Sequence, residues 1–156
     1  MDRVLSISDA ASLGLHAMML LARSDQDALV SARTLAGELD ASEAHLGKVL
    51  HQLTKSGLLR ARRGPHGGFR LRRPANEVTL LNVYEAIEGP LSTATCLLGR
   101  PRCDGRSCVL GGLLESVQHT VRNHLQSKRL SDFRSAHVSP ILGAAETSPL
   151  SMEVRT

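Results

Sequence analysis

Residues 31–73 constrain the fold more than any other part of the chain, because two helix signals and a glycine-rich hairpin follow one another there. Ser31 is a candidate N-cap for a short helix. Asp40, with Glu43 three residues later, forms a second capping signal. The stretch therefore predicts a helix, a tight turn, a second helix and then a β-hairpin.

The second helix has a clear apolar face. Its apolar residues recur at positions i, i+3, i+4 and i+7, and they are Leu46, Val49, Leu50 and Leu53. The other face carries Glu43, Gly47, Lys48 and His51. A helix that packs inward on one side and is polar on the other has the shape needed to lie in a DNA major groove.

The hairpin begins after Gly57, which suits the end of a helix. Its two strands flank the sequence Gly-Pro-His-Gly-Gly at residues 64–68, a strong turn signal. Phe69 and Leu71 alternate with Arg70 and Arg72, so one face of the second strand is apolar and the other is cationic.

Positive charge is concentrated in the same region. Residues 45–73 contain eight Lys or Arg residues and no Asp or Glu, whereas the rest of the chain has 11 basic and 15 acidic residues. The net charge of +4 therefore divides into a +8 stretch and a −4 remainder. Such a concentration favours binding to DNA phosphates, although a solvated charged surface is the alternative.

Three runs of sequence resemble the winged-helix regulators of the IscR and NsrR type. They are GLL at residues 57–59, RGPHGGFRL at 63–71 and VYEAIEG at 83–89, and the resemblance covers about residues 5–130. It implies a mainly α protein: a winged helix-turn-helix domain with a two-stranded β wing and a long C-terminal dimerisation helix. It also implies a homodimeric bacterial transcription factor, often with an iron-sulfur cluster.

The resemblance places the DNA contacts on the second helix and on the wing. On the helix they are Ser42, Glu43, Ala44, Gly47, Lys48 and His51. On the wing they are Arg62, Arg63, Gly64, Pro65, His66, Gly67 and Gly68. Because Ala44 and Gly47 offer no side-chain hydrogen bonds, we expect Lys48, His51 and the wing to provide much of the readout of a palindromic promoter site.

Size and composition fit one compact domain of 156 residues. Only Phe69, Tyr84 and Phe133 are aromatic, so the core must be built from aliphatic residues, which favours helices. No apolar run reaches 18 residues and no signal peptide is recognisable, so we expect a cytoplasmic protein without membrane contact.

Four segments are expected. Residues 1–90 form the DNA-binding domain, with a first helix over 7–22 that has Ser8 as its candidate cap, and a short helix opened by Thr79. Residues 91–108 form a cysteine-rich loop, 109–134 a dimerisation helix and 135–156 a disordered tail. The long helix has a stripe of apolar residues, which are Leu110, Leu114, Val117, Val121 and Leu125. We expect a second subunit to cover this stripe; the alternative is that the helix folds back on its own domain.

Cys96, Cys103 and Cys108 all lie in the predicted loop, interleaved with arginines and with turn-forming residues. Thiolates are the preferred ligands of iron-sulfur clusters and of zinc, and nearby arginines favour the thiolate form. Spacing alone leaves a cluster, zinc and a metal-free thiol switch open. The resemblance favours an iron-sulfur cluster, either 2Fe-2S or 4Fe-4S, with these three cysteines as ligands.

A fourth cluster ligand must come from elsewhere. Some relatives use a histidine three residues after the last cysteine, but this chain has Gly111 there. Others use an acidic residue at the start of the first helix of the partner subunit. Asp9 is the candidate carboxylate, ahead of Ser12 and His16.

The sequence therefore predicts a DNA-binding transcription regulator, most simply a repressor, whose cluster responds to nitric oxide, redox state or iron-sulfur supply. One alternative is a cluster-free thiol switch. Rivals from other classes are a thiol oxidoreductase using Cys103 or Cys108, and a module that binds acidic proteins. We expect no enzyme, because the chain has no Cys-x-x-Cys motif and no grouped acid, base and nucleophile.

Overall fold

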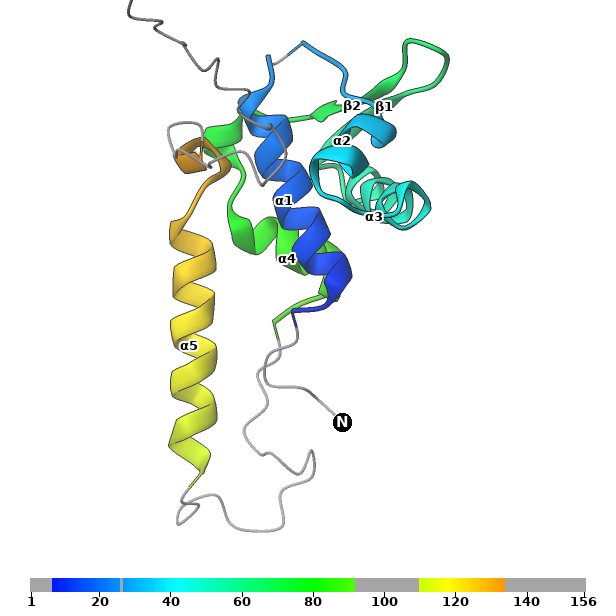
Figure 1. Cartoon of the computed structure of the whole chain (residues 1–156). Helices are drawn as coiled ribbons and strands as arrows, with labels where there is room; N and C mark the ends of the chain where they lie inside the picture. The colour runs from blue at the N-terminus through cyan, green and yellow to red at the C-terminus, as the bar shows by residue number, and fades with distance from the viewer. Residues whose placement is uncertain (1–6, 26, 92–109, 134–156) are drawn as a thin grey trace, which may run out of the picture.

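The computed structural model describes residues 7–25, 27–91 and 110–133. Figure 1 shows a helical domain with one small hairpin and a long helix at its side. In chain order the elements are α1 (Asp9–Arg23), α2 (Ala32–Glu38), α3 (Glu43–Lys55), β1 (Leu59–Arg62), β2 (Gly68–Leu71), the 3-10 turn η1 (Ala75–Glu77), α4 (Leu80–Glu88), α5 (Gly111–Ser127) and the 3-10 turn η2 (Leu130–Phe133). This is a mainly helical winged helix-turn-helix fold, as the sequence predicted.

Side-chain caps start four of the helices. The Ser8 hydroxyl accepts a hydrogen bond from the Ala11 amide, and Ser31 accepts one from Thr34 in the same way. Both caps were predicted. Thr79 and Asn82 form a reciprocal capping box at the start of α4.

The predicted cap of α3 is wrong. Ser42 caps this helix by accepting a hydrogen bond from the His45 amide, whereas Asp40 lies in the preceding turn with a φ of 47°. Both residues are good cap formers, so the local sequence does not choose between them. Ser42 is the cap because its backbone is extended, as an N-cap requires, whereas the backbone of Asp40 is in the left-handed region.

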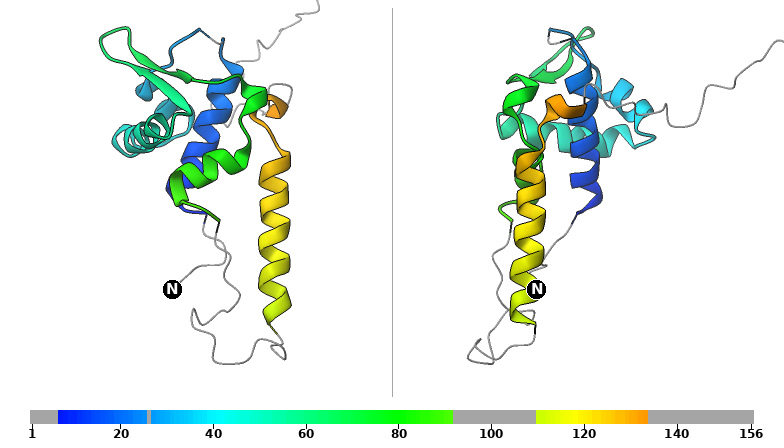
Figure 2. Two further views of the ribbon diagram at one scale, coloured as in Figure 1. Left: turned by 180° about the vertical axis from the view of Figure 1, so that it is seen from behind. Right: turned by 90° about the vertical axis from the view of Figure 1, so that its left-hand side faces the viewer.

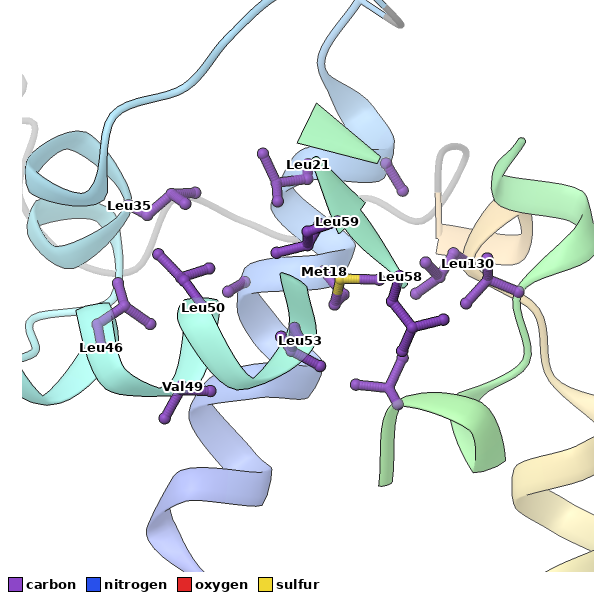
Figure 3. Packing of buried hydrophobic residues seen from close by; sticks show 14 of the residues in the cluster. Met18, Leu21, Leu35, Leu46, Val49, Leu50, Leu53, Leu58, Leu59 and Leu130 are labelled. Atoms are coloured by element: carbon purple, nitrogen blue, oxygen red, sulfur yellow. The ribbon is translucent and has the colours of Figure 1, made fainter. Parts of the chain in front are cut away.

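The core lies between α1, α3 and the base of the hairpin (Figure 3). Every predicted inward-facing residue of α3 is buried, and so are Met18 of α1 and Leu59 of β1. Gly14 lets α1 approach α4 closely, because a β-carbon there would overlap the side chain of Ile87.

The hairpin forms as predicted, with antiparallel pairing from Leu59 opposite Leu71 to Arg62 opposite Gly68. Val30 extends this sheet by an isolated bridge to Phe69, with N···O distances of 3.0 and 2.8 Å. The backbone before α2 is thereby fixed to the wing.

The long helix is shorter than predicted. α5 spans 17 residues, roughly 25 Å at 1.5 Å per residue, and it ends at Ser127, before the end of the predicted segment 109–134. Arg129 forms a bridge with Thr79, and the Leu130 amide donates to the carbonyl of Val78. Because Leu130 is completely buried in the core, the chain leaves the helix to place it there.

The two halves of α5 differ in their surroundings. Val121 and Leu125 pack against a second buried cluster that contains Leu81, Tyr84 and Leu91. The other end extends away from the domain in Figures 1 and 2, and Leu113 there is exposed. The chain's own domain therefore covers the C-terminal half of the stripe, and Leu114 in the other half is buried as well.

Across the described residues, no helix combines the length and apolarity needed to cross a bilayer.

Candidate nucleic-acid interface

The outer face of α3 does not pack against the core and is exposed to solvent. Ser42, Glu43, Ala44, Lys48 and His51 are exposed, and Gly47 is partly so. Figure 1 shows α3 at the edge of the domain, on the same side as the hairpin. The side chain of Gln52 donates to the carbonyls of Ala86 and Ile87, which holds α3 against the end of α4.

Several of these side chains already have partners within the chain. The Glu43 carboxylate lies 3.4 Å from Nε of Arg33 on α2. Both side chains are more than half exposed, so this ion pair stabilises little and can be exchanged for another partner. The Ser42 hydroxyl caps α3.

His45 was missed by the sequence reasoning. It is exposed on the first turn of α3, and its Nδ1 lies 3.4 Å from a carboxylate oxygen of Asp9 at the start of α1. Only the fold brings these two residues together, because nothing in the sequence pattern connects them. The helix periodicity could have shown that His45 is surface-exposed.

The tip of the wing depends on two glycines. Gly64 has a φ of 111°, which a residue with a side chain rarely adopts. A β-carbon on Gly67 would overlap the backbone of Arg62, so this position also requires glycine. Residues 62–66, from Arg62 to His66, are all exposed at this tip.

The wing and α3 present a dense set of free cations. The basic residues without an ion pair to another described residue are all exposed, and they are Lys48, Lys55, Arg60, Arg62, Arg63, Arg72 and Arg73. Arg70 is the exception, because its Nη1 lies 2.7 Å from Asp27. The predicted cationic face of the hairpin is therefore present, but one of its arginines is partly neutralised.

The three cysteines lie outside the described residues, so the predicted loop and its ligand set stay a prediction. Leu91, the last described residue before the gap, is fixed firmly. It is buried beside Ala11 of α1, its amide donates to Glu85 over 3.4 Å, and its carbonyl accepts from Arg122 over 3.2 Å. Leu91 therefore lies next to the first turns of α1.

The candidate fourth ligands all lie on those turns. The side chain of Asp9 is 79% exposed, so its carboxylate is accessible despite the contact with His45. The His16 ring donates from Nδ1 to the carbonyl of Ser12 over 2.8 Å, and it is exposed rather than in the core. Among the described residues, no three His, Cys, Asp or Glu side chains are grouped as a metal site would need.

A helix-turn-helix followed by a cationic β wing defines the class of winged-helix DNA-binding proteins. Residues 7–135 match the Rrf2 family, which is described as iron-dependent transcriptional regulators. The chain belongs to this family. It is a DNA-binding transcriptional regulator, as the sequence resemblance implied.

Individual relatives agree. The chain is similar to protein aau3 of Rhizobium meliloti, with 30% identity over 83% of this chain and 86% of the relative. Its fold is similar to that of CymR, the global cysteine regulator of B. subtilis, with a TM-score of 0.71, 26% identity, and coverage of 84% and 97%. It is also similar to T. potens IscR, with a TM-score of 0.66, 23% identity, and coverage of 82% and 85%.

Proposed function

We propose that this protein is a homodimeric, sequence-specific repressor that reads a palindromic promoter site with α3 and the wing. The observation that carries the proposal is the set of seven exposed, unpaired cations on and around α3 and the hairpin. Phosphates would bind to these cations, and base edges would meet the outer face of α3.

Each part of the interface has a role in this proposal. Lys48 and His51 project from the middle of α3 and supply hydrogen bonds to base edges in the major groove. Arg62, Arg63 and the tip from Gly64 to Gly68 lie against the neighbouring minor groove. Glu43 can accept from a cytosine amino group after releasing Arg33.

The long helix supports a dimer. Its exposed end carries Leu110 and Leu113, which are 46% and 55% exposed, and a second copy of the helix would cover them. At its other end, Leu130 and the Thr79–Arg129 bridge attach the helix to the reading domain. A dimer built this way would hold two copies of α3 at a fixed separation.

A glycine on α3 tests the position of the DNA. Nothing lies within 4 Å of a β-carbon at Gly47 or at Gly37 of α2. Gly47→Ala and Gly37→Ala should each raise the free energy of unfolding by up to about 1 kcal/mol, because alanine favours helix. Only Gly47→Ala should change the Kd for operator DNA, measured by fluorescence anisotropy. If both variants bound operator DNA as tightly as the native protein, the DNA would not lie against α3 at Gly47.

The same proposal assigns Cys96, Cys103 and Cys108 as ligands of an iron-sulfur cluster, with Asp9 as the fourth ligand. Three thiolates are a suitable donor set, and Leu91, the last described residue before them, is buried in one cluster with Ala11, two residues after Asp9. A bound cluster would supply a centre that reacts with nitric oxide or changes redox state. The family description as iron-dependent supports this assignment.

The cluster is tested by anaerobic purification with an absorbance spectrum and counts of iron and sulfide. The native protein should be coloured, Cys103→Ala should lose the colour, and Asp9→Ala should lower the iron content, whereas the exposed control Asp25→Ala should not. A colourless, iron-free native protein would contradict the cluster. If Asp9→Ala had the same iron content as the native protein, the fourth ligand would be another residue.

A metal-free thiol switch is the second candidate, since the three cysteines alone could sense oxidation. The similar CymR of Staphylococcus aureus has been solved in an oxidized form, which agrees with redox control. Neither version needs enzymatic chemistry, and we propose that the chain is not an enzyme. Cytoplasmic location follows from the same role.

Competition between heparin and duplex DNA tests the function itself. A sequence reader should retain one promoter duplex at heparin concentrations that release a scrambled duplex of equal length and composition. Release of both duplexes together would favour a module that binds any polyanion, including acidic proteins.

A further inference from the structure

A cavity of about 230 Å³ lies between the C-terminal end of α1 and the base of the wing. Its apolar lining includes Leu21, Ala22 and Ala75, which are all buried. Its polar lining comes from the segment after α1 and from the two strands and their exit. The cavity lies apart from the outer face of α3 and the tip of the wing, although its Arg60, Arg72 and Arg73 also belong to the seven cations proposed to bind phosphates.

Four arginines and two aspartates line this cavity. The cationic lining consists of Arg60, Arg70, Arg72 and Arg73, and the acidic lining consists of Asp25 and Asp27. Arg60 and Arg70 are directly opposite each other in the sheet, so their β-carbons lie roughly 5 Å apart. Their guanidinium groups therefore extend from neighbouring positions on one face of the hairpin, and an anion between them would offset their mutual repulsion.

The one counter-ion that Arg70 has among the described residues is easily replaced. Nη1 of Arg70 lies 2.7 Å from Asp27, but the Asp27 side chain is 99% exposed while that of Arg70 is only 32% exposed. A half-buried cation benefits from a permanent anion. Asp27 loses side-chain entropy when it pairs with Arg70, because the rest of its side chain is surrounded by solvent. A carboxylate of a ligand can therefore replace it.

We propose that this cavity binds a small organic dianion, of the size and charge of a four-carbon dicarboxylate. One carboxylate would lie between Arg60 and Arg70 in place of Asp27, and the other would reach Arg72 or Arg73 at the exit of β2. The carbon chain would cover Leu21, Ala22 and Ala75. The volume is below that of a site for drug-sized ligands, and the apolar floor distinguishes the cavity from an open phosphate-binding surface.

Isothermal titration of the full-length, anaerobically purified protein with succinate tests the proposal, with acetate at equal ionic strength as the monoanion control. Succinate should bind in the millimolar range or tighter, and acetate should bind at least tenfold more weakly. Arg60→Ala should weaken succinate binding about tenfold, because a charge-assisted hydrogen bond is lost. Lys128→Ala removes an exposed cation outside the cavity and should have no effect.

Asp27→Asn provides a second variant on an exposed residue, where folding is not at risk. It removes the competing carboxylate, so succinate should bind more tightly than to the native protein. The proposal would be overturned if neither the native protein nor Asp27→Asn bound succinate at about 10 mM. Equal affinity for succinate and acetate would overturn it as well. So would loss of DNA affinity in Arg60→Ala without any succinate binding, which would make these arginines phosphate contacts only.

Discussion

Replacing Arg62 and Arg63 together by alanine is expected to lower operator affinity by roughly two orders of magnitude, because each arginine in a groove contributes about 1–3 kcal/mol. Both side chains are exposed at the tip of the wing and form no ion pair with a described residue. Their loss should also reduce the slope of log K against log salt by roughly 2. Anisotropy titrations at two salt concentrations measure both quantities.

The control removes two cations elsewhere. Arg23 and Lys128 are exposed at the end of α1 and after α5, away from α3 and the tip of the wing. Arg23→Ala with Lys128→Ala should leave the salt slope nearly unchanged. If the Arg62 and Arg63 variant behaves like this control, the assignment of the wing to DNA is wrong.

Leu130→Ala is expected to lower the free energy of unfolding by about 2–5 kcal/mol, because it leaves a cavity in a fully packed core. Leu130 has no exposed surface, and η2, which contains it, packs against α1 and η1. Urea denaturation at several protein concentrations measures this loss, since the stability of a dimer depends on concentration.

Leu113→Ala is the matched leucine control, at the exposed end of α5. Leu113 is 55% exposed, so its truncation should cost the isolated subunit little. Its effect should instead appear as weaker dimerisation in sedimentation analysis. A loss of less than about 0.5 kcal/mol in Leu130→Ala would contradict the attachment of α5 to the core.

Local signals were sufficient for most of the fold. The caps at Ser8 and Ser31 and the spacing from Leu46 to Leu53 depend on neighbouring residues, so the sequence shows them directly. The glycine-rich turn predicted the wing, and Gly64 and Gly67 explain why this turn tolerates few other residues.

Long-range contacts decided what the sequence could not show. α5 ends early because Arg129 pairs with Thr79 and Leu130 enters the core. Asp27 neutralises Arg70 from 43 residues away, and no local pattern predicts this contact. The cluster ligands Cys96, Cys103 and Cys108 depend on a segment outside the described residues, so chemistry and resemblance alone support them.

Hydroxyl-radical footprinting on a genomic fragment containing the protein's own promoter tests the central claim most directly. A dimeric reader should protect two half-sites related by dyad symmetry, with centres about one helical turn or a multiple of it apart. Protection should include minor-groove positions beside each half-site, and these should disappear in the Arg62 and Arg63 variant. Uniform protection without symmetry, or a single unpaired site, would contradict a dimer that reads DNA with α3 and the wing.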